Sequence, residues 1–214
     1  MIYSITSSIA YFISRNIFKI GLHLFFRLKV EGEENVPRKG AFIAASNHVS
    51  YMDPPIVGSA FRRRVYFITS DHLFKSRSVG WWYNIVGCIR IKRGEADHRA
   101  IRKILDYLKD GKPVALFPEG TRSEDGELKD PFLGIGFLAL KSQVPVVPCF
   151  IKGSEVALPR GARSFRKARI RLYMGKMIEA REFACDGAQK KEAYRLLSRK
   201  VMNSIAGLKK CHAD

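Results

Sequence analysis

The stretch AFIAASNHVSYMDPP, residues 41–55, contains a complete transition from strand to helix. AFIAAS (41–46) is a short apolar run, which is typical of a buried strand. Asp53 precedes two prolines, a pattern typical of a helix N-terminus, where aspartate caps free amides and proline fits the first turn. The stretch therefore predicts a strand that passes through a polar loop into a helix.

The same alternation continues along the chain. Further strands are predicted at 65–70, 88–91, 113–117, 145–151 and 168–174, and helices at 54–61, 96–111, 133–143 and 187–208. Strands that alternate with helices predict an α/β domain with a largely parallel sheet flanked by helices. Pro148 predicts an edge strand or a kink in its run, because proline cannot donate to a sheet ladder.

Residues 1–29 form a separate unit, and we place the domain itself at 30–214. The unit has no proline and no acidic residue, and its polar residues recur in one narrow helical stripe: Ser4, Ser8, Arg15, Lys19 and His23. Because Arg15 and Lys19 interrupt the apolar run, the segment is a poor spanning helix. We expect an amphipathic helix that lies in a membrane interface. The alternative is a helix packed on the core of the domain.

The charge of the chain predicts an anionic partner. The 214 residues contain 38 Lys+Arg and 20 Asp+Glu, a formal net charge of +18. Nucleic acid, an anionic membrane or a phosphorylated substrate would each fit. The basic run at 160–171 matches no RNP, KH or helix-turn-helix pattern, so we expect no nucleic-acid partner and interpret it as a membrane-facing loop.

The four cysteines are scattered and form no CxxC pair. This spacing argues against a zinc site and against a disulfide framework. It indicates a reducing environment with exposure to the cytosol.

His48 follows a buried strand directly, and ligands usually bind at that end of an α/β sheet. In one interpretation His48 is a general base, and Asp53 holds its ring and stabilises its charged form. In the other, Asp53 is only a helix cap. The two roles are compatible, because a carboxylate has two oxygens.

A second polar block, LFPEGTRSEDG (116–126), also follows a strand. Gly120 allows a tight turn, and Glu119, Thr121 and Arg122 project from the sheet edge that carries His48. An arginine there can hold a phosphate by paired hydrogen bonds. The alternative is a solvated loop with a surface Glu–Arg pair. In GCIRIKRG (87–94), the cations either add charge to an anion pocket or form a solvated edge.

Together these blocks resemble the glycerolipid acyltransferase family, whose best-known members are 1-acyl-sn-glycerol-3-phosphate acyltransferases. The resemblance rests on Asn47-His48-x-Ser50-x-x-Asp53 and on FPEGTRS at 117–123, with weaker agreement at 87–94 and 144–154. It covers roughly residues 30–155.

The resemblance implies transfer of an acyl chain from acyl-CoA or acyl carrier protein to the hydroxyl of a lysophospholipid. The first candidate acceptor is 1-acyl-glycerol-3-phosphate, which gives phosphatidic acid. His48 would be the general base and Asp53 its partner. The residues assigned to substrate binding are Asn47, Ser50, Arg93, Glu119, Gly120, Thr121 and Arg122.

The resemblance also implies membrane lipids as partners and a membrane-associated location at the cytoplasmic face, which is the inner membrane in a bacterium. No metal or cofactor is expected besides the acyl donor, because a thioester can be attacked without one. Donors for the developing oxyanion are expected among backbone amides near the helix after Asp53. The alternatives are acylation of another lysolipid or an aminolipid, or a basic membrane- or nucleic-acid-binding module without activity.

Overall fold

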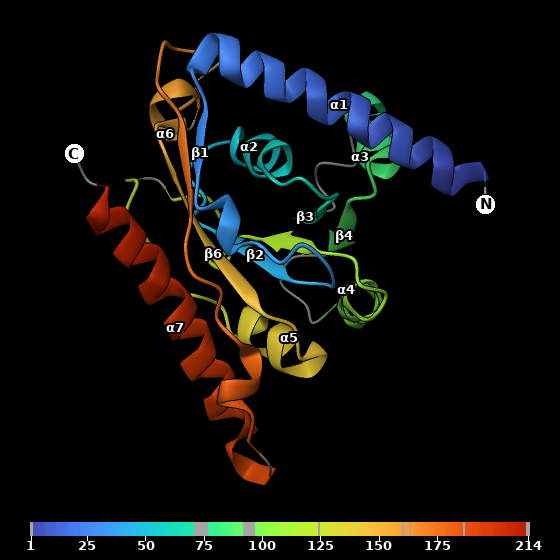
Figure 1. The fold of residues 1–214 in the computed structure, drawn as a ribbon, viewed down its shortest axis with the longest axis vertical. Helices are drawn as coiled ribbons and strands as arrows, with labels where there is room; N and C mark the ends of the chain where they lie inside the picture. The colour runs from blue at the N-terminus through green and yellow to red at the C-terminus, as the bar shows by residue number, and fades with distance from the viewer. Residues whose placement is uncertain are drawn as a thin grey trace.

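The computed structural model describes residues 2–70, 77–91, 97–123, 125–159, 161–162, 164–185 and 187–212. Its seven-stranded sheet has the order β1-β7-β6-β2-β5-β3-β4 (Figure 1). The strands are β1 (Lys29–Glu31), β2 (Ile43–Ser46), β3 (Tyr66–Ser70), β4 (Ile89–Ile91), β5 (Val114–Leu116), β6 (Val146–Lys152) and β7 (Arg171–Met174). Neighbouring strands pair in parallel, except that β6 and β7 are antiparallel. The predicted α/β class with a largely parallel sheet is therefore confirmed.

Helices cover both faces of the sheet (Figure 1). They are α1 (Ile2–Phe26), α2 (Asp53–Ala60), α3 (Arg77–Ile85), α4 (His98–Lys109), α5 (Gly134–Ser142), α6 (Ser154–Ala157) and α7 (Lys190–Cys211), with short turns η1 (Glu33–Asn35), η3 (Ala180–Phe183) and η4 (Gly187–Gln189). One core lies under α1, α2 and α6, and the other lies under α4, α5 and α7. Neither β1 nor α3 was among the elements predicted from the sequence.

The order of the strands places the two polar blocks side by side. β2 and β5 are neighbours in parallel register, from Ile43↔Val114 to Ala45↔Leu116. The helix that follows β2 (α2) packs on one face of the sheet, and the helix that follows β5 (α5) packs on the other. Connections that leave neighbouring strands towards opposite faces open a crevice at the carboxyl ends of the strands, where such sheets bind ligands.

Pro148 does not lie in an edge strand, so the edge-strand alternative is wrong. β6 is an interior strand between β7 and β2, and Pro148 pairs with Ala45. Its carbonyl accepts a hydrogen bond from Gly175 N at 2.8 Å, and its missing N–H faces the same neighbour. The ladder with β7 begins at Cys149, so the missing donor lies at the end of the paired region.

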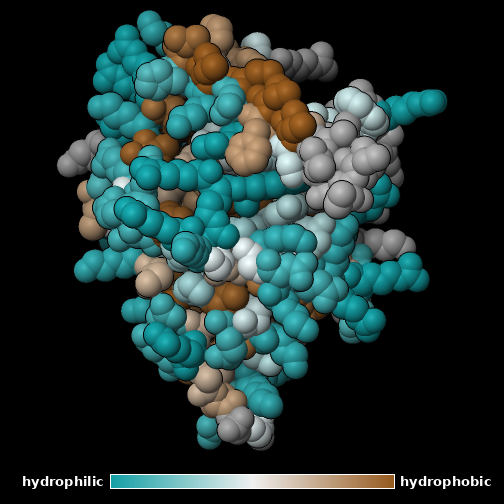
Figure 2. All heavy atoms as spheres, turned by 45° about the vertical axis from the view of Figure 1, so that its right-hand side comes forward, coloured by the Kyte–Doolittle hydropathy of each residue, from teal (hydrophilic) through white to brown (hydrophobic). Residues whose placement is uncertain are grey.

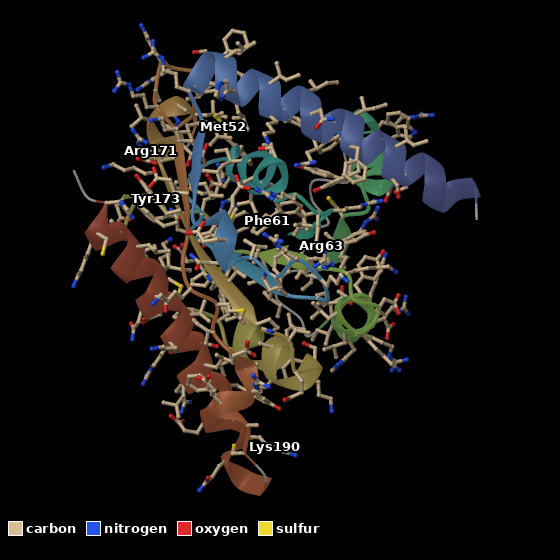
Figure 3. The ribbon with its side chains drawn as sticks, viewed as in Figure 1. Met52, Phe61, Arg63, Arg171, Tyr173 and Lys190 are labelled. Atoms are coloured by element: carbon tan, nitrogen blue, oxygen red, sulfur yellow. The ribbon has the colours of Figure 1, made fainter. Side chains whose placement is uncertain are left out.

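Both ends of α2 are anchored in the core by buried flanking residues. Met52 and Phe61 stand just before and just after the helix, and both are buried (Figure 3). The ring of Phe61 packs on Phe42 with centroids 5.4 Å apart. The start of α2, where Asp53 lies, is therefore fixed relative to the sheet.

The long N-terminal helix packs on the domain with one side only. Tyr11 and Leu22 are buried, and the Tyr11 hydroxyl donates to Gly58 O at 3.3 Å. Large apolar side chains on the other side are exposed, up to 74% for Phe25. Figure 2 shows hydrophobic side chains gathered at the end of the molecule where α1 lies. Among the helices of the described residues, none is apolar over a length sufficient to cross a membrane.

The contact between α5 and α7 provides a test of the packing. An added Cβ at Gly136 would overlap the carbonyl oxygen of Tyr194 in α7. Overpacking of this kind costs about 1–3 kcal/mol, so we expect Gly136→Ala to lower the free energy of unfolding by that amount. The control is Gly134→Ala, because an added Cβ there meets nothing within 4 Å. Urea unfolding measures both, and equal midpoints would contradict this packing.

Candidate active site

The carboxylate of Asp53 lies at the centre of the loop after β2 and is fully buried, with 0% exposure. Its Oδ2 accepts hydrogen bonds from His48 Nδ1 at 2.8 Å, Val49 N at 2.7 Å and Ser50 N at 2.8 Å. Its Oδ1 accepts one from Ser154 Oγ at 2.7 Å. These four bonds offset the cost of removing a charged carboxylate from water.

Asp53 is not the helix cap that the sequence predicts. Met52 occupies the N-cap, Asp53 is the first helical residue, and its carboxylate turns back to the loop. The start of the helix also offers no free amide to a substrate. Met52 N donates to Ser50 Oγ at 3.2 Å, and the two prolines that follow Asp53 have no N–H. The first turn of α2 therefore does not supply the expected oxyanion donors, and donors elsewhere near this helix stay a prediction.

The ring of His48 is held on its edge and on its face. Asp53 binds Nδ1, and the ring of Phe117 stacks on the imidazole with centroids 4.0 Å apart and an interplanar angle of 15°. Because Nδ1 donates to a carboxylate, the neutral ring carries its proton there and leaves Nε2 as the acceptor. This is the arrangement that a general base requires.

A second buried carboxylate joins the two loops. Glu119 is 2% exposed; its Oε1 accepts from His48 N at 3.0 Å and its Oε2 from Lys129 N at 3.2 Å. Burial raises the pKa of Glu119, while the amide hydrogen bonds oppose that rise. Ser123 N also donates to His48 O at 2.7 Å. Glu119 therefore holds the backbone of the loop that carries His48.

The turn after Glu119 depends on glycine. Gly120 has φ +66°, and a Cβ there would lie 2.6 Å from the ring of Phe132. Only glycine takes this left-handed conformation without strain, and only glycine leaves room for the ring. The turn directs Thr121 and Arg122 towards the cavity in front of His48.

A cavity of about 1740 Å³ opens in front of His48. Most of its walls are apolar, and many of the apolar side chains come from α1, α2 and α3. The cationic side chains that line it are Arg15, Arg122, Arg166 and Lys167. No acidic side chain of the described residues lines it. The cavity suits a molecule with a long apolar chain and an anionic group.

The structure brings four of the residues predicted to form the site to the cavity: His48, Gly120, Thr121 and Arg122. Asp53 and Glu119 lie behind them, bonded to backbone and to His48. Arg93 lies outside the described residues.

Asn47 and Ser50 bond to neighbouring segments. The amide of Asn47 pairs with Ile151 N and O at 2.7 and 3.0 Å. Ser50 Oγ donates to Leu158 O at 2.9 Å. The observed role of both is to fix the loop after β2, and their assignment to substrate binding stays a prediction.

The sequence analysis missed two residues that shape the site. Ser154 lies two residues after the end of β6, at the same edge of the sheet as His48. The rule that ligands bind at strand ends places Ser154 near the site, but it does not predict the bond to Asp53, which is 101 residues away in sequence. Tyr51 lies inside the loop between His48 and Asp53, and the Arg122 guanidinium lies over its ring.

Ser154 offers a test of the buried carboxylate. We expect Ser154→Ala to lower the free energy of unfolding by about 1–3 kcal/mol, because Asp53 Oδ1 is left without a donor in a dry site. The control is Ser142→Ala, because the Ser142 hydroxyl donates to helix carbonyls, such as that of Leu138. Chemical denaturation measures both variants. A Ser154→Ala loss no larger than that of the control would contradict the bond.

Comparisons with known proteins match the chain to acyltransferases. The chain matches the model of a family described as Acyltransferase over residues 27–152, a range that contains both motif loops. It is 29% identical over 192 residues to the chloroplastic 1-acyl-sn-glycerol-3-phosphate acyltransferase LPAT1 of Arabidopsis thaliana, covering 86% of this chain and 53% of that protein. It is 27% identical over 171 residues to a 1-acyl-sn-glycerol-3-phosphate acyltransferase of Bacillus subtilis, covering 79% and 82%.

The chain spans about half the length of the first curated relatives it matches. Among solved structures, it is similar to the 1-acyl-sn-glycerophosphate (LPA) acyltransferase PlsC from Thermotoga maritima. The TM-score is 0.71 at 27% identity, and the match covers 94% of this chain and 80% of that chain. The likeness in fold therefore extends beyond the motif loops.

Proposed function

The chain belongs to the acyltransferase family, and from this premise we propose that it acylates the free hydroxyl of 1-acyl-glycerol-3-phosphate to give phosphatidic acid. The donor in this proposal is a thioester, either acyl-CoA or acyl carrier protein. The observation that carries it is the His48–Asp53 pair at the rim of an apolar cavity lined by cations. The relatives from Arabidopsis thaliana and Bacillus subtilis are named for this acceptor, which supports the choice.

In the proposed reaction, His48 Nε2 takes the proton of the acceptor hydroxyl as its oxygen attacks the thioester carbonyl carbon. The tetrahedral intermediate then expels the donor sulfur, and the departing thiolate receives the proton from the imidazolium. Asp53 stabilises that imidazolium and holds its ring. Attack on a thioester needs no metal or redox group. The acyl donor is a co-substrate of the reaction.

The anionic group of the acceptor is proposed to bind Arg122. Its Nη1 is buried and has no hydrogen-bond partner within the part of the chain that the structure describes. A guanidinium binds phosphate by paired, charge-assisted hydrogen bonds, which makes this free donor a fit for a phosphate monoester. Arg93 stays a proposed second contact. A binding module without activity would need no base fixed as firmly as His48.

We propose that the protein works at a membrane surface, on the cytoplasmic side where both donors occur, which would be the inner membrane in a bacterium. The exposed apolar side of α1 would lie in the interface. Phe165, from the predicted membrane-facing loop, packs edge to face against Phe26 with centroids 5.9 Å apart, and Arg166 and Lys167 beside it are exposed. These cations would meet anionic headgroups at the mouth of the cavity.

Replacement of the base tests the reaction. We expect His48→Ala to lower kcat by about 10²–10⁴-fold, because a positioned base contributes that much to proton transfer. The control is His98→Ala, since His98 is exposed on α4. Acyl transfer to 1-acyl-glycerol-3-phosphate measures both, with vesicle binding expected to be unchanged. A His48→Ala enzyme of ordinary activity would rule out the general-base role.

Polar substitutions on α1 test membrane attachment. Ile13, Ile17 and Leu24 are exposed apolar residues of α1, and we expect their joint replacement by serine to reduce binding to anionic vesicles at least tenfold, since each buried aliphatic side chain contributes about 1.5–3 kcal/mol. The control is Leu196→Ser on α7, which covers the other face of the sheet. Vesicle co-sedimentation provides the measurement. Equal binding of the two variants would contradict attachment through α1.

A further inference from the structure

The guanidinium of Arg122 lies flat against an aromatic ring of the neighbouring loop. Its Cζ is 3.5 Å from the centroid of Tyr51, well inside the distance at which a cation is attracted to the face of a ring. Tyr51 is 58% exposed, so its ring contributes little to the core. Both residues line the cavity in front of His48. The stacking is therefore a contact within the site.

Among the described residues of this loop, the carboxylates of Glu119 and Asp125 are engaged by other donors. Both oxygens of Glu119 accept backbone amides, and Asp125 accepts from Ser123 Oγ at 2.8 Å and from Glu127 N at 3.0 Å. No ion pair of Arg122 occurs among the residues whose placement the structure describes. The ring of Tyr51 is thus the observed support of this guanidinium.

A ring supports an arginine differently from a carboxylate. A carboxylate would occupy the N–H donors of the guanidinium and neutralise the charge that an incoming phosphate needs. A stacked ring contacts the flat face and leaves the donors at the edge free. The unpartnered Nη1 of Arg122 agrees with this arrangement.

We propose that Tyr51 is a positioning residue, which holds the Arg122 guanidinium so that its edge faces the phosphate of the acceptor. Tyr51 belongs to the loop in which the backbone amides of Val49 and Ser50, directly after His48, donate to Asp53. The same loop therefore sets both the base and the support of the anion-binding arginine. This fixes the spacing between the phosphate and the hydroxyl that His48 deprotonates. The inference rests on the proposed function, because it takes Arg122 as the phosphate ligand.

A double-mutant cycle tests the coupling, with the variants Tyr51→Leu, Arg122→Gln and their combination. The measured quantities are kcat and KM for 1-acyl-glycerol-3-phosphate in mixed micelles. We expect Tyr51→Leu to raise KM roughly three- to tenfold, with kcat within about twofold, because the stacking energy is lost from binding. We expect Arg122→Gln to raise KM about tenfold or more, and Tyr51→Leu to add nothing in that background.

The conservative variant separates the ring from other roles of Tyr51. Tyr51→Phe keeps the stacking face, so we expect a KM within about twofold of the unmodified protein. Tyr51→Gln is a second variant that removes the ring with a polar side chain, and it should match Tyr51→Leu. Because Tyr51 is largely exposed, thermal unfolding midpoints and binding to anionic vesicles should stay unchanged in all three.

The outcomes distinguish two failures. If Arg122→Gln raises KM but Tyr51→Leu multiplies KM equally in both backgrounds, the positioning role is overturned while the proposed phosphate contact stands. A Tyr51→Phe enzyme as impaired as Tyr51→Leu would also overturn it, since the hydroxyl would then be the active group. If Arg122→Gln leaves KM unchanged, the proposed phosphate contact fails, and the role of Tyr51 fails with it.

Discussion

The site depends on one carboxylate that has been taken out of water. A buried charge without partners costs several kcal/mol, and Asp53 meets this cost with four hydrogen bonds from three separate sources. Two come from loop amides, one from the imidazole of His48, and one from Ser154 at the start of α6. The buried charge of Asp53 therefore fixes three features at once. They are the path of the loop, the position of the His48 ring and the attachment of α6 to the site.

Glu119 is a second buried carboxylate, in the adjacent loop, and backbone amides satisfy it in the same way. The positions of the two carboxylates explain why the cavity is lined by cations. Each acid lies behind the surface, bonded to amides or to His48, while the arginine that follows Glu119 faces the cavity. The acidic residues of the motifs thus shape the backbone, and the cations meet the solvent-filled space. A motif with as many acids as cations can in this way build a site for an anion.

The fold could be predicted because strands of a parallel sheet are buried on both faces and appear as continuous apolar runs, as AFIAAS does at β2. The place of His48 and Asp53 after such a run left two interpretations open, and the second polar block at 116–126 decided between them. The contact of Ser154 with Asp53 could not be predicted, because a serine that follows a strand has no distinctive neighbours in sequence. The interior position of Pro148 also could not be predicted from the sequence. It depends on the order of the strands, which is set by connections elsewhere in the chain.

The two faces of the sheet differ in what they contribute, since no described residue of α4, α5 or α7 lines the cavity. This separation has a consequence for thiol chemistry. Cys88 and Cys149 are buried, which raises the pKa of each to about 12 and keeps both protonated and unreactive. Cys211 is exposed near the end of α7. A maleimide-linked fluorophore or surface tether directed to it would therefore mark α7 and leave the face that carries the cavity unmodified.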